Sequence, residues 1–109
     1  MIDLGRELSV PVLQIDLANG FFRDRVRVDL NGRTVLDRED VTTRTQIEFA
    51  ADCSAEVATG RSKLQVVLSE RGLSESFPVD VSGPTYLEIS IAPDGRIRCR
   101  SSPEPFRRA

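Results

Sequence analysis

The side chains that most often carry enzyme chemistry are scarce in this 109-residue sequence. It contains no histidine and only two cysteines, Cys53 and Cys99, which are separated by forty-five residues and form no CxxC motif. Without histidine, a Ser-His-Asp or Cys-His catalytic arrangement and a histidine-ligated zinc or iron site are excluded. The seven glycines are scattered singly, so no phosphate-binding loop is present. We therefore expect a protein that is not an enzyme and has no catalytic, metal or cofactor site.

Each cysteine falls in an alternating pattern that is typical of a strand, and we expect both to be buried free thiols. Cys53 alternates with Ala55 and Val57, and Cys99 alternates with Ile97. A disulfide joining two sheets is the alternative, and it requires an oxidising compartment. The N-terminus MIDLGRELSV lacks the apolar run of a secretory signal, and no segment has the length and apolarity of a membrane helix. These features favour a cytoplasmic protein, with secretion as the alternative.

Carboxylates are the remaining candidates for ligand chemistry, and the densest acidic stretch covers residues 37–40, with the sequence DRED. Hard oxygen ligands bind calcium in proteins, but this stretch has neither EF-hand spacing nor an Asp-x-Asp-x-Asp run. A solvated acidic loop is therefore the preferred interpretation. A glycan site normally needs aromatic platforms, and the chain offers Tyr86 and five phenylalanines, most of them at core positions. A glycan- or calcium-binding module remains the alternative function.

Basic side chains gather near the C-terminus. Residues 95–109 contain five arginines and one glutamate, a charge of +4, so residues 1–94 carry −6 of the total of −2. Arg96, Arg98 and Arg100 alternate with apolar residues, as on the exposed face of a final strand. The acidic total argues against nucleic-acid binding. We take these three arginines, together with Phe22, as a candidate contact surface.

The clearest structural signal is a hairpin over residues 25–38, RVRVDLNGRTVLDR. Three apolar residues alternate with charged ones, and Asn31-Gly32 supplies the positive φ angles of a tight two-residue turn. This turn predicts that Val28 faces Val35 and that Asp29 faces Thr34 across the ladder. Beyond these pairs, the same register would set apolar residues of one strand opposite charged residues of the other. This mismatch predicts a phase shift or a bulge after Val35.

Similar alternation and turn signals recur along the chain. Pro11 marks a phase change in the first strand, residues 9–17, which places that strand at an edge or a bulge. Of the adjacent Phe21 and Phe22, one should point inward and the other outward. Thr43–Phe49 also alternates and is predicted to be a strand. No segment has sustained helical spacing, so we predict seven to nine strands, about eight, in an all-β, two-sheet antiparallel sandwich with essentially no helix.

The predicted core consists of the apolar residues that alternate along these strands. They are Leu13, Ile15, Val26, Val28, Leu30, Val35, Ile47, Phe49, Val57, Leu64, Val66, Leu68, Phe77, Val79, Val81, Leu87, Ile89, Ile91 and Ile97. The predicted domain covers residues 1–102, with a lead-in at Met1–Leu8, and residues 103–109 form a tail that docks through Phe106.

The strand rhythm of VRVDLNGRTVLD, SKLQVVLSERG and PTYLEISI resembles that of small bacterial immunoglobulin-like or prealbumin-like accessory domains. The resemblance implies architecture alone, and the chain lacks the tryptophan of true immunoglobulin domains. We therefore predict a structural or interaction module that binds a protein partner or itself through its edge strands, with no nucleic-acid or membrane partner. The last strand is the open edge in this interpretation, because Pro11 blunts the first.

Overall fold

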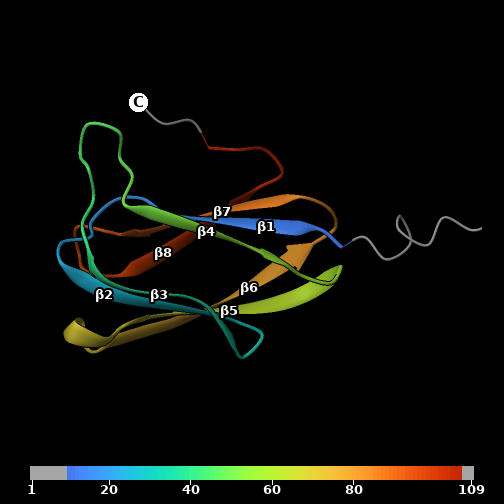
Figure 1. Cartoon of the computed structure of the whole chain (residues 1–109), viewed down its shortest axis with the longest axis horizontal. Coiled ribbons are helices and arrows are strands. Elements are labelled where there is room, and N and C mark those ends of the chain that lie inside the picture. The colour runs from blue at the N-terminus through green and yellow to red at the C-terminus, as the bar shows by residue number, and fades with distance from the viewer. Residues whose placement is uncertain (1–9, 107–109) are drawn as a thin grey trace, which may run out of the picture.

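The computed structural model describes residues 10–106 and contains eight strands in two stacked sheets (Figure 1). The first sheet has the order β4-β1-β7-β8 and the second has the order β3-β2-β5-β6. The elements are β1 (Val12–Leu17), β2 (Asp24–Leu30), β3 (Arg33–Val41), β4 (Ala51–Glu56), β5 (Gly60–Leu68), the 3-10 turn η1 (Ser69–Arg71), β6 (Leu73–Val81), β7 (Thr85–Ile91) and β8 (Ile97–Ser102). The predicted sandwich is thus confirmed, and the described residues contain no α-helix. The predicted lead-in at residues 1–8 lies outside the described residues.

Alternating apolar side chains from both sheets form one core between the layers. Along β7, for example, Leu87 and Ile89 are fully buried while Tyr86 and Glu88 lie on the outer face. Four residues of the predicted core are only half-buried, and these are Val35, Ile47, Phe49 and Phe77. Six buried apolar residues were not predicted, and these are Leu17, Ala18, Phe21, Leu36, Val41 and Ala51. As expected for neighbours on one chain, Phe21 is buried and Phe22 is 70% exposed.

The β2–β3 hairpin has the predicted turn but a shifted register. Asn31 and Gly32 have φ angles of 52° and 83°, as the two-residue turn requires. Asp29 faces Thr34, whose hydroxyl donates to the Asp29 carboxylate at 2.7 Å. The predicted Val28–Val35 pair is wrong, because the ladder shifts there and Val28 faces Leu36. Val35 is the extra, unpaired residue of a β-bulge, and it allows the apolar Leu36 to face the apolar Val28.

The predicted strand Thr43–Phe49 is also wrong, because the chain reverses within it. Arg44 and Phe49 form an isolated bridge, and the four residues between them form a turn in which Glu48 has a φ of 53°. Thr43 is anchored to the β1–β2 loop, where its hydroxyl donates to the carbonyl of Ala18 at 2.7 Å. Backbone groups here are satisfied locally and by that loop, so the alternating side chains do not face the core. Ile47 and Phe49 are only half-buried.

The first strand lies in the interior of its sheet, and the prediction that it is an edge is wrong. β1 pairs with β4 antiparallel and with β7 parallel. Pro11 precedes the strand, where its carbonyl accepts from the Val57 amide at 3.1 Å and its missing N–H removes only the return bond to Val57. β1 and β2 belong to opposite sheets, whereas immunoglobulin constant domains keep their first two strands in one sheet. The strand order therefore differs from the immunoglobulin one.

A buried ion pair fixes the turn that leads into β6. Asp24 is 3% exposed and accepts two hydrogen bonds from the Arg71 guanidinium, at 2.8 and 2.9 Å. The same carboxylate accepts from the Phe22 amide, and Arg71 also donates to the Gly20 carbonyl. Such bidentate, charge-assisted bonds are strong. They join η1 to the beginning of β2 and to the loop before it.

Candidate interaction edge

The last strand, β8, forms one edge of the first sheet and presents Arg98 and Arg100 on the outer face. Arg100 donates to the Glu88 carboxylate at 2.6 Å, and its guanidinium lies 4.8 Å from the Phe106 ring centroid. Arg98 is 3.8 Å from Asp94, with both side chains more than half exposed, so this pair contributes little. The predicted exposure of alternate arginines on the last strand is therefore confirmed for Arg98 and Arg100, whereas Arg96 lies before the strand.

Arg96 and Phe22, the other two candidate contact residues, lie in loops. Arg96 precedes β8, and its backbone N–H donates to the Asp94 side chain at 3.0 Å. Within residues 10–106 its guanidinium makes no hydrogen bond or ion pair. Phe22 lies between β1 and β2, and the guanidinium of Arg23 is 5.7 Å from its ring centroid. Arg96 thus lies directly before the strand that carries Arg98 and Arg100. No contact in the described structure joins Phe22 to any of these three arginines.

The hydrogen bonds of the β7–β8 hairpin decide which backbone groups face outward. The Ala92 amide donates to the Arg96 carbonyl at 2.8 Å, which makes this a hydrogen-bonded pair. In an antiparallel ladder such pairs recur at every second residue, so Arg98, Arg100 and Ser102 direct their N–H and C=O groups toward β7. The N–H and C=O groups of Ile97, Cys99 and Ser101 therefore point away from the sheet. Within residues 10–106, no hydrogen bond involves these outward N–H and C=O groups.

The β6 edge of the second sheet is interrupted by a proline. Lys63 on β5 exchanges hydrogen bonds with Asn31, so its backbone faces away from β6, and it lies opposite Pro78. The backbone of Pro78 consequently faces outward, together with those of Ser74, Ser76 and Asp80. Because proline has no N–H, it removes one donor from the middle of this edge. β6 is a poor template for an added strand.

The two other edges are also obstructed. On β3, the bulge at Val35 and the positive φ of Asp40, 57°, interrupt the regular extended backbone. On β4, the outward carbonyl of Glu56 accepts from the Arg33 guanidinium at 3.5 Å, which covers one end of the strand. Of the four edges, β8 alone has neither a proline, a bulge nor a side-chain cap in the described structure.

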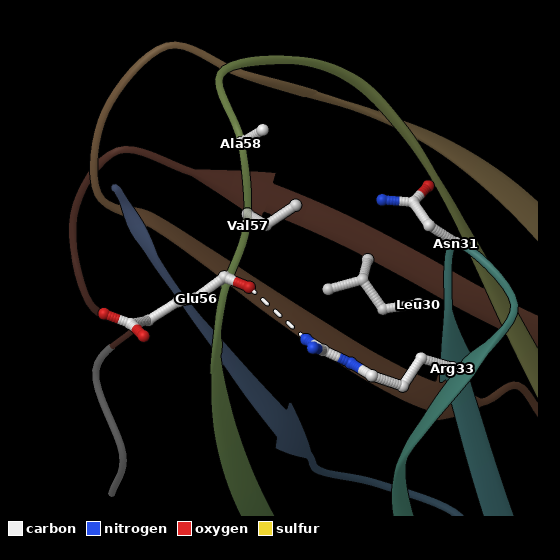
Figure 2. Close-up of a pocket in the computed structure, with 6 residues that line it drawn as sticks. All are labelled: Leu30, Asn31, Arg33, Glu56, Val57 and Ala58. Carbon is white, nitrogen blue, oxygen red and sulfur yellow. Dashed lines mark hydrogen bonds between the residues drawn. The ribbon is translucent and has the colours of Figure 1, made fainter. Parts of the chain in front are cut away.

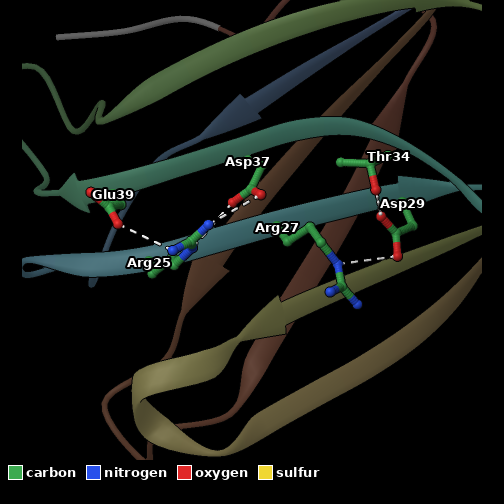
Figure 3. Close-up of polar contacts among 6 residues, drawn as sticks. All are labelled: Arg25, Arg27, Asp29, Thr34, Asp37 and Glu39. Carbon is green, nitrogen blue, oxygen red and sulfur yellow. Dashed lines mark hydrogen bonds and ion pairs between the residues drawn. The ribbon is translucent and has the colours of Figure 1, made fainter.

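Charged side chains also cover the outer face of the second sheet, where Figure 3 shows two small networks. Arg25 pairs with Asp37 at 3.3 Å and with Glu39 at 3.1 Å. Its hydrogen bond to Asp37 and the charges of both carboxylates raise its pKa. Arg27 pairs with Asp29 at 3.3 Å. Two of the three carboxylates in the acidic stretch 37–40 are therefore already engaged by an arginine.

A small pocket opens between the β2–β3 turn and the chain after β4 (Figure 2). It has a volume of about 300 Å³ and is lined by Leu30, Asn31, Arg33, Glu56, Val57 and Ala58. Arg33 reaches across it to the backbone of Glu56, as the dashed line in Figure 2 shows. The carboxylate of Glu56 points away from the other lining residues in Figure 2, and the lining has no nucleophile, so the chemistry of the pocket indicates no reaction.

The two cysteines are free and lie on opposite edges of the first sheet. Cys53 on β4 and Cys99 on β8 have β1 and β7 between them, a separation of about 14 Å at the usual strand spacing. This exceeds the span of a disulfide, so the prediction of free thiols is confirmed, although both side chains are half-buried and not fully buried as predicted. Burial raises the pKa of both thiols to about 11, with Asp52 and Asp16 adding to the shift of Cys53. Neither is a reactive thiolate at neutral pH.

Neither a metal-binding cluster, a membrane-spanning helix nor a known relative points to a function for the described residues. Within residues 10–106, no group of three or more histidine, cysteine or acidic side chains could hold a metal ion. None of the helices in that range is long and apolar enough to cross a membrane. No protein-family model matches the chain, and a search of curated proteins finds no similar sequence.

Proposed function

We propose that this chain is a non-enzymatic interaction module that binds an extended polypeptide by strand addition at β8. The observation that carries the proposal is the row of outward N–H and C=O groups at Ile97, Cys99 and Ser101, since β3 and β6 are interrupted and β4 is capped at one end by Arg33. Uncovered edges of this kind pair with extended segments, and main-chain hydrogen bonds provide the affinity. The alternative of a calcium or glycan module gains no support from the described side chains.

Ser101→Pro tests the proposal, because it removes an outward N–H without removing a bond to β7. The protein is titrated with three short peptides in which threonine alternates with glutamate, glutamine or lysine, and binding is followed by calorimetry. We expect the wild type to bind at least one peptide and Ser101→Pro to bind that peptide at least tenfold more weakly. Ser101→Ala, which keeps the N–H, and Ser76→Pro, on the obstructed β6 edge, should bind like the wild type.

Two results would reject strand addition at β8. The first is a wild-type protein that binds none of the three peptides and is monomeric at every concentration. The second is a Ser101→Pro variant that remains folded by circular dichroism and binds as tightly as the wild type.

A further inference from the structure

We infer that the segment which pairs with β8 is acidic and comes from a different protein, and that β8 does not pair with β8 of a second copy. The inference rests on the proposed strand addition and specifies its partner. It follows from two features of the strand, namely which residues turn their backbone groups outward and which side chains share its outer face.

Pairing of β8 with itself places arginines opposite arginines in every central register. A two-fold axis makes the paired strands antiparallel, and their hydrogen bonds must join outward positions 97, 99 and 101 of one copy with those of the other. Even-numbered positions then always oppose even-numbered positions. The resulting pairs are Arg98 with Arg98, Arg98 with Arg100, or Arg100 with Arg100. Like charges directly opposite each other destabilise an antiparallel pair.

The acidic edge strand β4 of a second copy does not solve this problem. The Val57–Pro11 hydrogen bond sets the alternation along β4, so the outward backbone groups belong to Asp52, Ser54 and Glu56, whose side chains lie on the outer face. On β8, the outward groups belong to residues whose side chains face the core. Directly opposed residues share a face, so antiparallel pairing of β4 with β8 would set the carboxylates beside Cys99 and away from the arginines. Parallel pairing would put the outer-face residues of β4 opposite the arginines, but Asp52 and Glu56 are four positions apart and Arg98 and Arg100 only two. One of the two arginines would therefore face Ser54 and remain without a carboxylate.

A separate acidic strand fits the charges that remain. Arg98 has one weak contact at 3.8 Å with Asp94, and the guanidinium of Arg96 has none within the described residues. Carboxylates at alternate positions of an added strand would lie opposite Arg98 and Arg100 on the outer face. Glu88 already engages Arg100 from the other side, so that arginine would lie between two carboxylates. Opposite-charge pairs of this kind stabilise a ladder.

The three peptides above separate this inference from the proposed function. We expect the glutamate peptide to bind about two- to thirtyfold more tightly than the glutamine peptide, since each of two opposite-charge pairs adds a modest gain. The lysine peptide should bind most weakly, and high salt should reduce the difference. Equal binding of all three peptides that is lost in Ser101→Pro would retain strand addition and reject the acidic partner. A single-stranded oligonucleotide that binds as tightly as the glutamate peptide to both the wild type and Ser101→Pro would indicate a general polyanion patch and reject both.

Reversing the charge of Arg98 should allow the self-association through β8 that the wild-type arginines prevent. In Arg98→Glu, the new carboxylate faces Arg100 of a second copy when position 99 pairs with position 99, so two repulsive pairs become attractive. By light scattering, we expect the wild type to remain monomeric and Arg98→Glu to form a dimer whose fraction rises with concentration. The variant should also lose the preference for the glutamate peptide. A wild type that dimerises, with Ser101→Pro abolishing the dimer, would overturn the inference while supporting strand addition.

Discussion

The edge strands β6 and β8 approach each other on one side of the sandwich, yet they present different backbones to solvent. Both pair antiparallel with a single neighbour and both alternate between core and surface. β6 turns Pro78 outward, which breaks its row of donors, whereas the outward row of β8 is complete at three successive positions. The residue at one outward position therefore decides, more than the overall apolarity of a strand, whether an edge is available for pairing.

The two edges also differ in charge. On β6, the outward Asp80 is paired with Arg61 at 3.2 Å, and the neighbouring outward residues are serines and Pro78. On β8, Arg98 has only a weak partner. Without its proline, the β6 edge would accept segments of any charge, whereas the basic β8 edge favours acidic segments.

The substitution with the largest expected effect is one that unfolds the protein and so removes both edge strands together. Val28 is fully buried in β2, and Val28→Asp would place an unpaired carboxylate in the shared core. The cost of several kcal/mol is comparable with a total stability of about 5–15 kcal/mol. We expect loss of the cooperative thermal transition by circular dichroism. Val12→Asp, at a position that is 47% exposed, should change the melting temperature little. A well-folded Val28→Asp protein would show that the assigned core face is wrong.

A smaller change should loosen β6 and spare β8. Arg71→Ala leaves the buried Asp24 carboxylate without its main partner at the entry to β6. Since Arg71 is about one-third exposed, we expect a loss of about 2 kcal/mol, below the range for fully buried pairs. Urea unfolding measures the loss, and hydrogen exchange should quicken more in β6 than in β8. Arg61→Ala, which breaks an exposed pair, should cost less than about 0.5 kcal/mol. Equal losses in the two variants would contradict the assignment.

Opening the β6 edge should change association more than stability. Pro78→Ser restores an outward N–H, and its effect on the free energy of unfolding should stay within about 1 kcal/mol. Paired β6 strands would place Ser76 opposite Ser76 and Glu75 opposite Phe77, with no like charges directly opposite each other, so this variant should dimerise with rising concentration in light scattering. Pro84→Ser, in the β6–β7 loop, should remain monomeric. A monomeric Pro78→Ser protein would mean that the proline does not control this edge.

The smallest effect distinguishes the thiols at the two edges of the first sheet. With a pKa of about 11 in place of 9.0, each thiol should be alkylated at pH 8 about a hundredfold more slowly than in the unfolded chain. Because folding raises both pKa values, their contribution to stability is full below about pH 9 and is lost as the pH rises toward 11. Salt should speed the reaction of Cys53, which lies near Asp52 and Asp16, more than that of Cys99. Mass spectrometry of Cys53→Ser and Cys99→Ser measures the remaining thiol, and equal salt effects would contradict the assigned cause.

Local patterns predicted much of the fold, and long-range contacts account for most of the errors. Asn31-Gly32 located the hairpin because its positive φ angles are a local requirement. Thr43–Phe49 has strand periodicity, but the turn within it depends on contacts with the β1–β2 loop, which no local pattern reveals. The Asp24–Arg71 pair joins residues 47 positions apart and was not predicted.

The candidate edge was predictable only in part. Alternation correctly indicated that Arg98 and Arg100 are exposed on the last strand. The strand order, which puts β1 inside its sheet and makes β6 an edge, depends on the packing of both sheets. For the same reason, the outward direction of the Pro78 backbone follows from the position of β5 and not from the sequence around the proline.

The most direct test is amide hydrogen exchange, resolved by residue, with and without the glutamate peptide. The free protein should exchange the amides of Ile97, Cys99 and Ser101 quickly, and those of Arg98 and Arg100 slowly. The peptide should protect the first three amides and leave Ser74 and Ser76 on β6 unchanged. Protection that appears on β6, or slow exchange at Cys99 and Ser101 in the free monomer, would contradict the assignment of β8 as the open edge.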